Sequence, residues 1–117
     1  MPSTAKRKAT AERRRELFEE AASLIRREYA EDLSLDVLAR RVASSRRQLQ
    51  RAFAEAGDTS FRSYLQRVRM AKARELLREG TLPVNRVAAA VGYHEPAQFA
   101  KAFRRHHGTP PSRFASG

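Results

Sequence analysis

The chain of 117 residues is long enough for one compact domain, or for two small subdomains that share a connecting helix. It contains no cysteine, which excludes disulfide bonds, thiolate metal sites and thiol catalysis. With 24 Lys and Arg against 13 Asp and Glu, its net charge of +11 favours a polyanionic partner, such as nucleic acid or an anionic membrane.

The first 29 residues combine a basic segment with a helical pattern. Met1–Thr10 is rich in small and basic residues, and we expect it to be a disordered tail that either aids solubility or lies along phosphates. From Ala11 to Tyr29, apolar residues recur with the period of a helix. This stripe consists of Leu17, Ala21, Leu24, Ile25 and Tyr29.

Residues 34–56 have the pattern of two short helices joined by a tight turn. Ser34 is a suitable N-cap for a helix over Leu35–Val42, and Ser45-Arg46-Arg47-Gln48 forms a capping box that opens the next helix. Such a pair is a helix-turn-helix, whose second helix enters the major groove of DNA. A generic helical hairpin would have a similar pattern.

A long helix is expected next, starting after Thr59 or Ser60 and ending near Glu79-Gly80. Its apolar residues change face along its length, so it can serve one small core at each end. About 19 residues at ~1.5 Å each span roughly 28 Å, which approaches the ~34 Å of one DNA turn.

Residues 83–107 repeat the plan of residues 35–56. Pro83 suits the first turn of a short helix that Gly92 ends, Pro96 opens the following helix, and Phe114 can pack back behind it. We therefore predict an all-α fold of about seven helices, with two helix-turn-helix subdomains joined by a long central linker helix. The boundaries expected are a tail over 1–10, a first subdomain over 11–58, a linker over 59–80 and a second subdomain over 81–117.

The second helix of each pair has two different sides. Leu49 and Phe53, and likewise Phe99 and Phe103, lie four residues apart and would point into a core. The opposite sides carry mostly basic and amide groups. In the second helix of the first pair these residues are Arg47, Gln50 and Arg51, and in the second helix of the second pair they are Ala97, Lys101, Arg104 and Arg105. Arginine reads guanine and glutamine reads adenine through paired hydrogen bonds, so this design suggests a protein that reads a DNA duplex at two places.

No constellation for catalysis is present in the sequence. His106 and His107 are adjacent and diverge on a helix, so they cannot chelate a metal as an i, i+4 pair would. The zinc-protease, P-loop and dinucleotide-binding motifs are absent. We therefore expect no enzyme, no cofactor and no metal. Since no apolar run approaches the ~18 residues of a membrane span and no signal peptide is evident, a soluble cytoplasmic protein is expected.

The chain resembles the DNA-binding region of the AraC/XylS family of bacterial transcription regulators over about residues 13–115. The second half carries the more specific match, at Ala88, Val91-Gly92-Tyr93, Phe99, Phe103, Gly108-Thr109-Pro110-Pro111 and Phe114. The first half agrees at Leu35, Ala39, Val42, Ser45, Leu49, Arg51-Ala52-Phe53, Tyr64, Arg69 and Ala73–Leu77.

The resemblance implies a sequence-specific regulator, by family habit an activator, acting at the bacterial nucleoid. It would bind double-stranded DNA as a monomer, with two recognition helices in adjacent major-groove segments and some bending of the duplex. Base contacts carried over by position are Arg47, Gln50, Arg51, Ala97, Gln98 and Lys101. Phosphate contacts are expected at Arg41, Ser45, Arg46, Arg86, Arg104, Arg105 and Arg113.

Two departures from the family pattern concern the second helix-turn-helix. His94 and Glu95 occupy a turn where the family often has Ser or Asp, and a carboxylate there would repel phosphates. Ala97 offers only a methyl group, which can touch thymine but donates no hydrogen bond.

Other functions remain open from the sequence alone. Most family members carry a further sensing or dimerising domain, so this chain looks like the standalone MarA/SoxS type, and Met1 favours a complete protein. One alternative is an architectural DNA binder that uses charge without reading sequence. Another is an adaptor for RNA polymerase, which would use the first helix and Gln66, Arg67 and Arg74.

Overall fold

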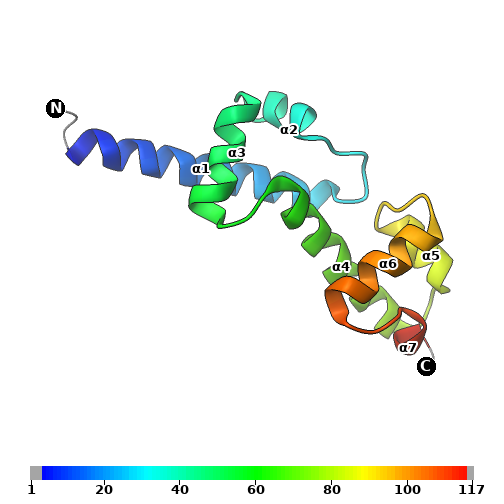
Figure 1. Cartoon of the computed structure of the whole chain (residues 1–117). Helices are drawn as coiled ribbons and strands as arrows, with labels where there is room; N and C mark the ends of the chain where they lie inside the picture. The colour runs from blue at the N-terminus through cyan, green and yellow to red at the C-terminus, as the bar shows by residue number, and fades with distance from the viewer. Residues whose placement is uncertain (1–3, 116–117) are drawn as a thin grey trace. The chain divides into compact units, whose positions relative to one another are not determined.

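Helices are the only regular secondary structure over the residues that the computed structural model describes, 4–115, with side chains described from Ala9 to Phe114 (Figure 1). The helices are α1 (Thr4–Glu28), α2 (Leu35–Arg41), α3 (Arg46–Gly57), α4 (Phe61–Glu79), α5 (Val84–Ala90), α6 (Pro96–His107) and α7 (Ser112–Ala115). The predicted all-α fold of about seven helices is confirmed. The N-cap serine of α4 is Ser60, whose hydroxyl accepts from the Ser63 amide at 3.1 Å.

Helix α1 corrects the expectation of a disordered tail. It begins at Thr4, so residues 4–10 are helical, while Met1–Ser3 lie outside the described residues. The segment consists largely of alanine, lysine and arginine, which are strong helix formers. Extending an existing helix is much easier than nucleating one, and the helix from Ala11 onward supplies the nucleus.

The chain forms two compact units. The first combines the chain up to Arg27 with Leu33–Tyr64, and the second combines Glu28–Asp32 with the chain from Leu65 onward. Helix α4 therefore contributes its first turn to one unit and its remaining turns to the other. This confirms that one helix serves a small core at each end.

The first unit is built around the buried ring of Phe53 in α3. The rings of Phe18, Phe61 and Tyr64 surround it, with centroids 5.3, 6.2 and 6.0 Å away. The sequence analysis did not include Phe18 in the apolar stripe of the first helix. Helical periodicity alone could not show that Phe18 contacts the Phe53 ring of α3. The Phe18 ring also lies directly against Gly57, where an added Cβ would come within 2.4 Å of it. The Gly57 position therefore has no room for a side chain.

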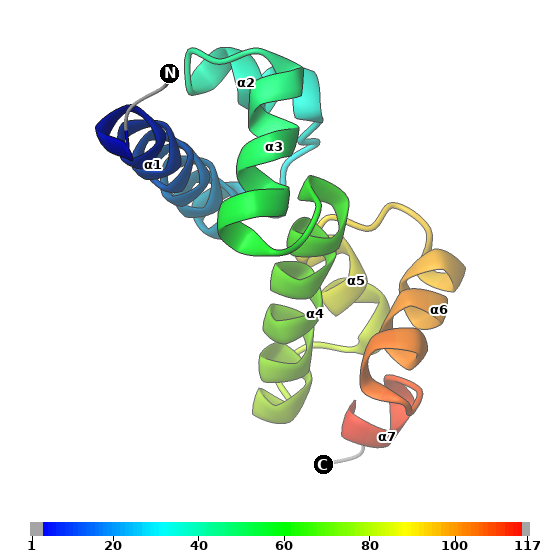
Figure 2. The same ribbon diagram turned by 60° about the vertical axis from the view of Figure 1, so that its left-hand side comes forward.

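The second unit is built around α4, α5 and α6, which lie side by side in Figure 2. Its core consists of Met70, Ala73, Leu77, Val87, Ala88, Val91, Phe99, Ala102 and Phe103. As expected, Phe114 of α7 packs back on this core, with its ring centroid 5.6 Å from that of Phe103. The guanidinium groups of Arg74 and Arg78 cover the outer side of the Phe114 ring, at 5.6 and 5.8 Å from its centroid.

Arg69 of α4 ties the segment after α1 into the second unit. Its Nε donates to the Tyr29 carbonyl at 2.7 Å, and its Nη2 donates to the Glu31 carbonyl at 2.9 Å. The guanidinium also lies 5.7 Å from the centre of the Tyr93 ring. Burial lowers the pKa of Arg69, while Tyr93 and Asp32 oppose this shift. Three segments far apart in the sequence therefore meet at one half-buried cation.

We expect Arg69→Ala to lower the free energy of unfolding of the second unit by about 2 kcal/mol, because two carbonyls lose a charged donor. Arg69→Lys should recover less than half of this loss, since an ammonium group cannot reproduce the planar fork. Urea unfolding followed by circular dichroism measures both effects. Arg67→Ala, at an exposed position of the same helix, is the matched control, and an equal effect at both positions would contradict the role of Arg69.

Candidate nucleic-acid interface

Helices α2 and α3 are joined by a turn whose backbone bonds explain its shape. The Ser44 amide donates to the Ala39 carbonyl at 2.8 Å, and the Ala43 amide donates to the Arg40 carbonyl at 3.2 Å. These bonds form a Schellman motif, which requires a left-handed residue just after the C-cap. Ala43 occupies that position with φ of 53°.

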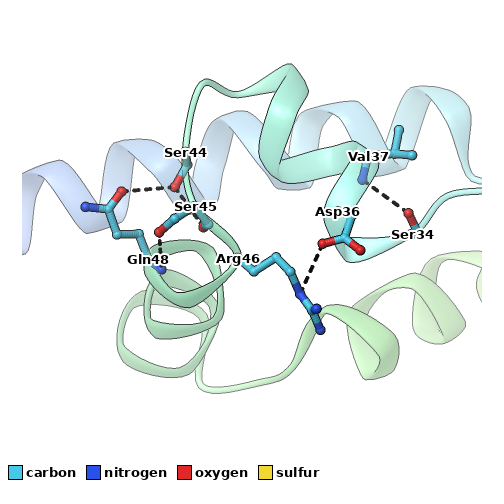
Figure 3. Close-up of polar contacts among 7 residues, drawn as sticks. All are labelled: Ser34, Asp36, Val37, Ser44, Ser45, Arg46 and Gln48. Carbon is cyan, nitrogen blue, oxygen red and sulfur yellow. Dashed lines mark hydrogen bonds and ion pairs between the residues drawn. The ribbon is translucent and has the colours of Figure 1, made fainter.

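A serine is the N-cap residue of each helix in this pair (Figure 3). The Ser34 hydroxyl accepts from the Val37 amide, and the Ser45 hydroxyl accepts from the Gln48 amide, each at 3.1 Å. Both predicted N-caps are confirmed. The Ser44 hydroxyl donates to Oε1 of Gln48 at 3.4 Å. In a capping box this oxygen would accept from the backbone amide of the N-cap residue, Ser45.

Helices α5 and α6 repeat the same turn. The Tyr93 amide donates to the Ala88 carbonyl at 2.9 Å, and Gly92 takes the left-handed position with φ of 95°. The start of α6 differs from that of α3. Glu95 is the N-cap residue of α6, and among the described residues its side chain accepts no hydrogen bond from the amides of the first turn. Pro96 follows at the first helical position, where its missing amide hydrogen leaves one fewer donor unpaired.

The outer faces of α3 and α6 hold all six residues predicted to contact bases. Leu49, Phe53, Phe99 and Phe103 are 0% exposed, which confirms that they are core residues. On the other sides, the exposed residues are Arg47, Gln50 and Arg51 in α3, and Ala97, Gln98 and Lys101 in α6. Each unit therefore presents one polar helix face to solvent.

The two faces are not chemically equal. Since the core pairs lie 50 residues apart, Arg47 corresponds to Ala97 and Arg51 corresponds to Lys101. Two arginines that can form paired hydrogen bonds are thus replaced by a methyl group and a point charge. Helix α3 has the greater capacity to read base edges.

The residues predicted to contact phosphates are exposed as well. They are Arg41, Ser45 and Arg46 in the first unit, and Arg86, Arg104, Arg105 and Arg113 in the second. Arg104 and Arg105 lie in the last turn of α6, where the helix dipole also favours cations. These two therefore have a structural reason to be basic that is independent of DNA.

Arg46 has a partner that the sequence analysis did not identify. Its Nε lies 3.1 Å from Oδ1 of Asp36, in the first turn of α2 (Figure 3). The two side chains border a surface hollow of about 390 Å³, together with Ala39, Arg40 and Ser44. The sequence analysis predicted the turn between these residues but not its conformation. It therefore could not show that two side chains ten positions apart come into contact.

The two adjacent histidines have different surroundings. His107 packs on Phe103, with ring centroids 4.4 Å apart, and its Nε2 lies 3.0 Å from the Met70 carbonyl. His106 is exposed, and partial burial of its ring, together with His107 and Arg67, lowers its pKa. No group of three or more potential metal ligands occurs in the part of the chain that the structure describes.

Comparisons with known proteins agree with this geometry. The family described as a helix-turn-helix domain matches residues 38–117. The HTH-type transcriptional regulator GbdR of Pseudomonas aeruginosa is 33% identical over 94 residues, which are 80% of this chain and 26% of that protein. A transcriptional regulator structure from Chromobacterium violaceum, of the AraC-type DNA-binding kind, has a TM-score of 0.80 at 30% identity, covering 86% of this chain and 89% of that one.

The chain is also similar to the DNA-binding domain of AdpA, solved in complex with a target DNA. The TM-score is 0.79 at 25% identity, over 85% of this chain and 89% of that one. The chain therefore belongs to the AraC-type helix-turn-helix family of transcriptional regulators. It spans about a quarter of the length of GbdR. None of the described helices has the length and apolar content needed to cross a bilayer.

The strained turn yields a stability prediction. Alanine is disfavoured in the left-handed region that Ala43 occupies, so Ala43→Gly should raise the free energy of unfolding by roughly 0.5–1 kcal/mol. Ala39→Gly, inside α2, is the control and should lower it by about 1 kcal/mol or more, because glycine weakens a helix interior. Urea titration compares the two variants. Destabilisation by both would show that the turn is not strained at Ala43.

Proposed function

We propose that this protein regulates bacterial transcription by binding a specific, asymmetric site on double-stranded DNA as a monomer. In the complex that we propose, the exposed polar faces of α3 and α6 enter successive major-groove segments of one duplex. The observation that carries the proposal is the repeated helix-turn-helix, in which buried apolar pairs leave a polar face of α3 and of α6 open to solvent. Major grooves admit a helix with this arrangement.

The contacts divide into two kinds. Arg47, Gln50 and Arg51 of α3, with Ala97, Gln98 and Lys101 of α6, contact base edges and set the preferred sequence. Arg41, Ser45, Arg86, Arg104, Arg105 and Arg113 contact phosphates and hold the protein in register. Arg46 was expected at a phosphate as well, but its ion pair with Asp36 leaves it out of this set. Residues 61–117 carry 11 basic and only 3 acidic residues, which supports an electrostatic role for the second unit.

Activation of transcription is the proposed outcome, and it needs a contact with RNA polymerase in addition to DNA. Arg67 and Arg74 are exposed on α4 and Gln66 is partly exposed, so these residues can serve this contact. Arg74 also covers the Phe114 ring, which fixes the place of its guanidinium. Such a protein works where the bacterial chromosome is, in the nucleoid.

The division between base and phosphate contacts is tested by one pair of variants. Arg51→Ala should weaken binding to the preferred site by about 1–3 kcal/mol and relax the preference at one base pair, because its paired hydrogen bonds are lost. Arg105→Ala should weaken binding to all sequences about equally and reduce the salt slope by about 1. Selection from a randomised DNA library, followed by competition titration, measures both.

Two results would count against the proposal. Equal behaviour of the two variants across the library would remove the division of roles. A wild-type preference well below ~10³ over bulk duplex would instead favour an architectural protein that binds through charge alone.

A further inference from the structure

The ion pair between Asp36 and Arg46 lies at the edge of the proposed DNA-binding face of the first unit. Asp36 is in the first turn of α2, Arg46 is the first residue of α3, and the two begin the two helices of one helix-turn-helix. Both side chains are more than 60% exposed. Exposed ion pairs add little to stability, so the pair can be removed by substitution without unfolding the first unit.

The helix dipoles favour this pairing from both sides. The positive N-terminal end of α2 favours an acidic residue such as Asp36 in its first turn. The same kind of positive end in α3 disfavours a cation at its first residue, Arg46. Contact with Asp36 relieves this repulsion. The structure thus gives Arg46 a local reason to remain with Asp36 when a phosphate comes near.

We propose that Asp36 holds Arg46 away from the DNA backbone and so limits the affinity of the protein for duplex of any sequence. The inference rests on the proposed function, because it requires the α3 face to approach DNA. Phosphate contacts supply most of the affinity for non-specific DNA. Neutralising one arginine therefore lowers binding to bulk DNA and leaves Arg47, Gln50 and Arg51 to decide where the protein stays.

The hollow beside the pair supports this assignment. Arg40 and Arg46 both border it, so the site has two guanidinium groups that can bind a phosphate. Asp36 is the one acidic residue among the side chains that border it. Its Oδ1 lies 3.1 Å from Nε of Arg46, so the guanidinium already has an anionic oxygen as its partner.

The decisive variant is Asp36→Asn, which removes the charge and keeps the shape. We expect it to bind the selected site and random-sequence duplex about two- to fivefold more tightly, in line with the loss of one exposed ion pair. The slope of log K against log salt should steepen by about 0.9, the value for one added phosphate contact. Glu20→Gln, at an exposed position of α1, has the same charge change and serves as the matched control.

A scan of duplexes that carry one neutral methylphosphonate at a time identifies the contact directly. Asp36→Asn should be sensitive at one phosphate at which the wild-type protein and Asp36→Asn/Arg46→Ala are not. Circular dichroism should show the same helix content and a melting temperature within a few degrees for all variants.

Each other outcome overturns the inference. It fails if the wild-type protein already depends on that phosphate through Arg46, if Asp36→Asn gains no new phosphate, or if Glu20→Gln changes the salt slope equally. The proposed function is judged separately, by the wild-type preference for its selected site on the unmodified duplex. A protein without any preference would refute that function, while the salt slope on random-sequence duplex would still decide the role of Asp36, because it does not depend on a fixed register.

Discussion

The burial of two large apolar side chains, four residues apart, determines how each recognition helix is presented. Leu49 and Phe53 in α3, and Phe99 and Phe103 in α6, are 0% exposed. With these side chains fixed inside, the polar residues at the remaining positions of each helix face solvent, because a helix places neighbours three and four residues apart on one side. The core therefore decides which residues can reach a nucleic acid.

The turns that precede these helices depend on the same packing. Each needs a residue in the left-handed region, which Gly92 adopts freely and Ala43 adopts under strain. In the second unit the turn is also crowded, since a side chain at Gly92 would come within about 3 Å of Arg69 and of the Ala30 carbonyl. The first unit tolerates alanine, while the second requires glycine for both conformation and space.

The net charge of +11 does not show which basic residues are available to a nucleic acid. Arg69 is half-buried and serves the fold, while Arg74 and Arg78 cover Phe114. Arg46 is paired with an acidic neighbour, and Arg14 is paired with Glu55 of α3. Several cations therefore have structural partners, and those on the outer faces of α3 and α6 remain the best candidates for DNA.

The sequence by itself determined the helical fold, the repeated helix-turn-helix and the core pairs, because helical periodicity, caps and glycine stops act over a few residues. The helical start at Thr4 was also within reach of local helix propensity, although the sequence analysis expected a tail there. The sequence did not determine the place of Phe18 beside Phe53, or the partners of Arg69 and Arg46. These contacts join residues 10 to 40 positions apart. Only the folded chain decides them, because two side chains pair when packing brings their helices together, and no local pattern records that approach.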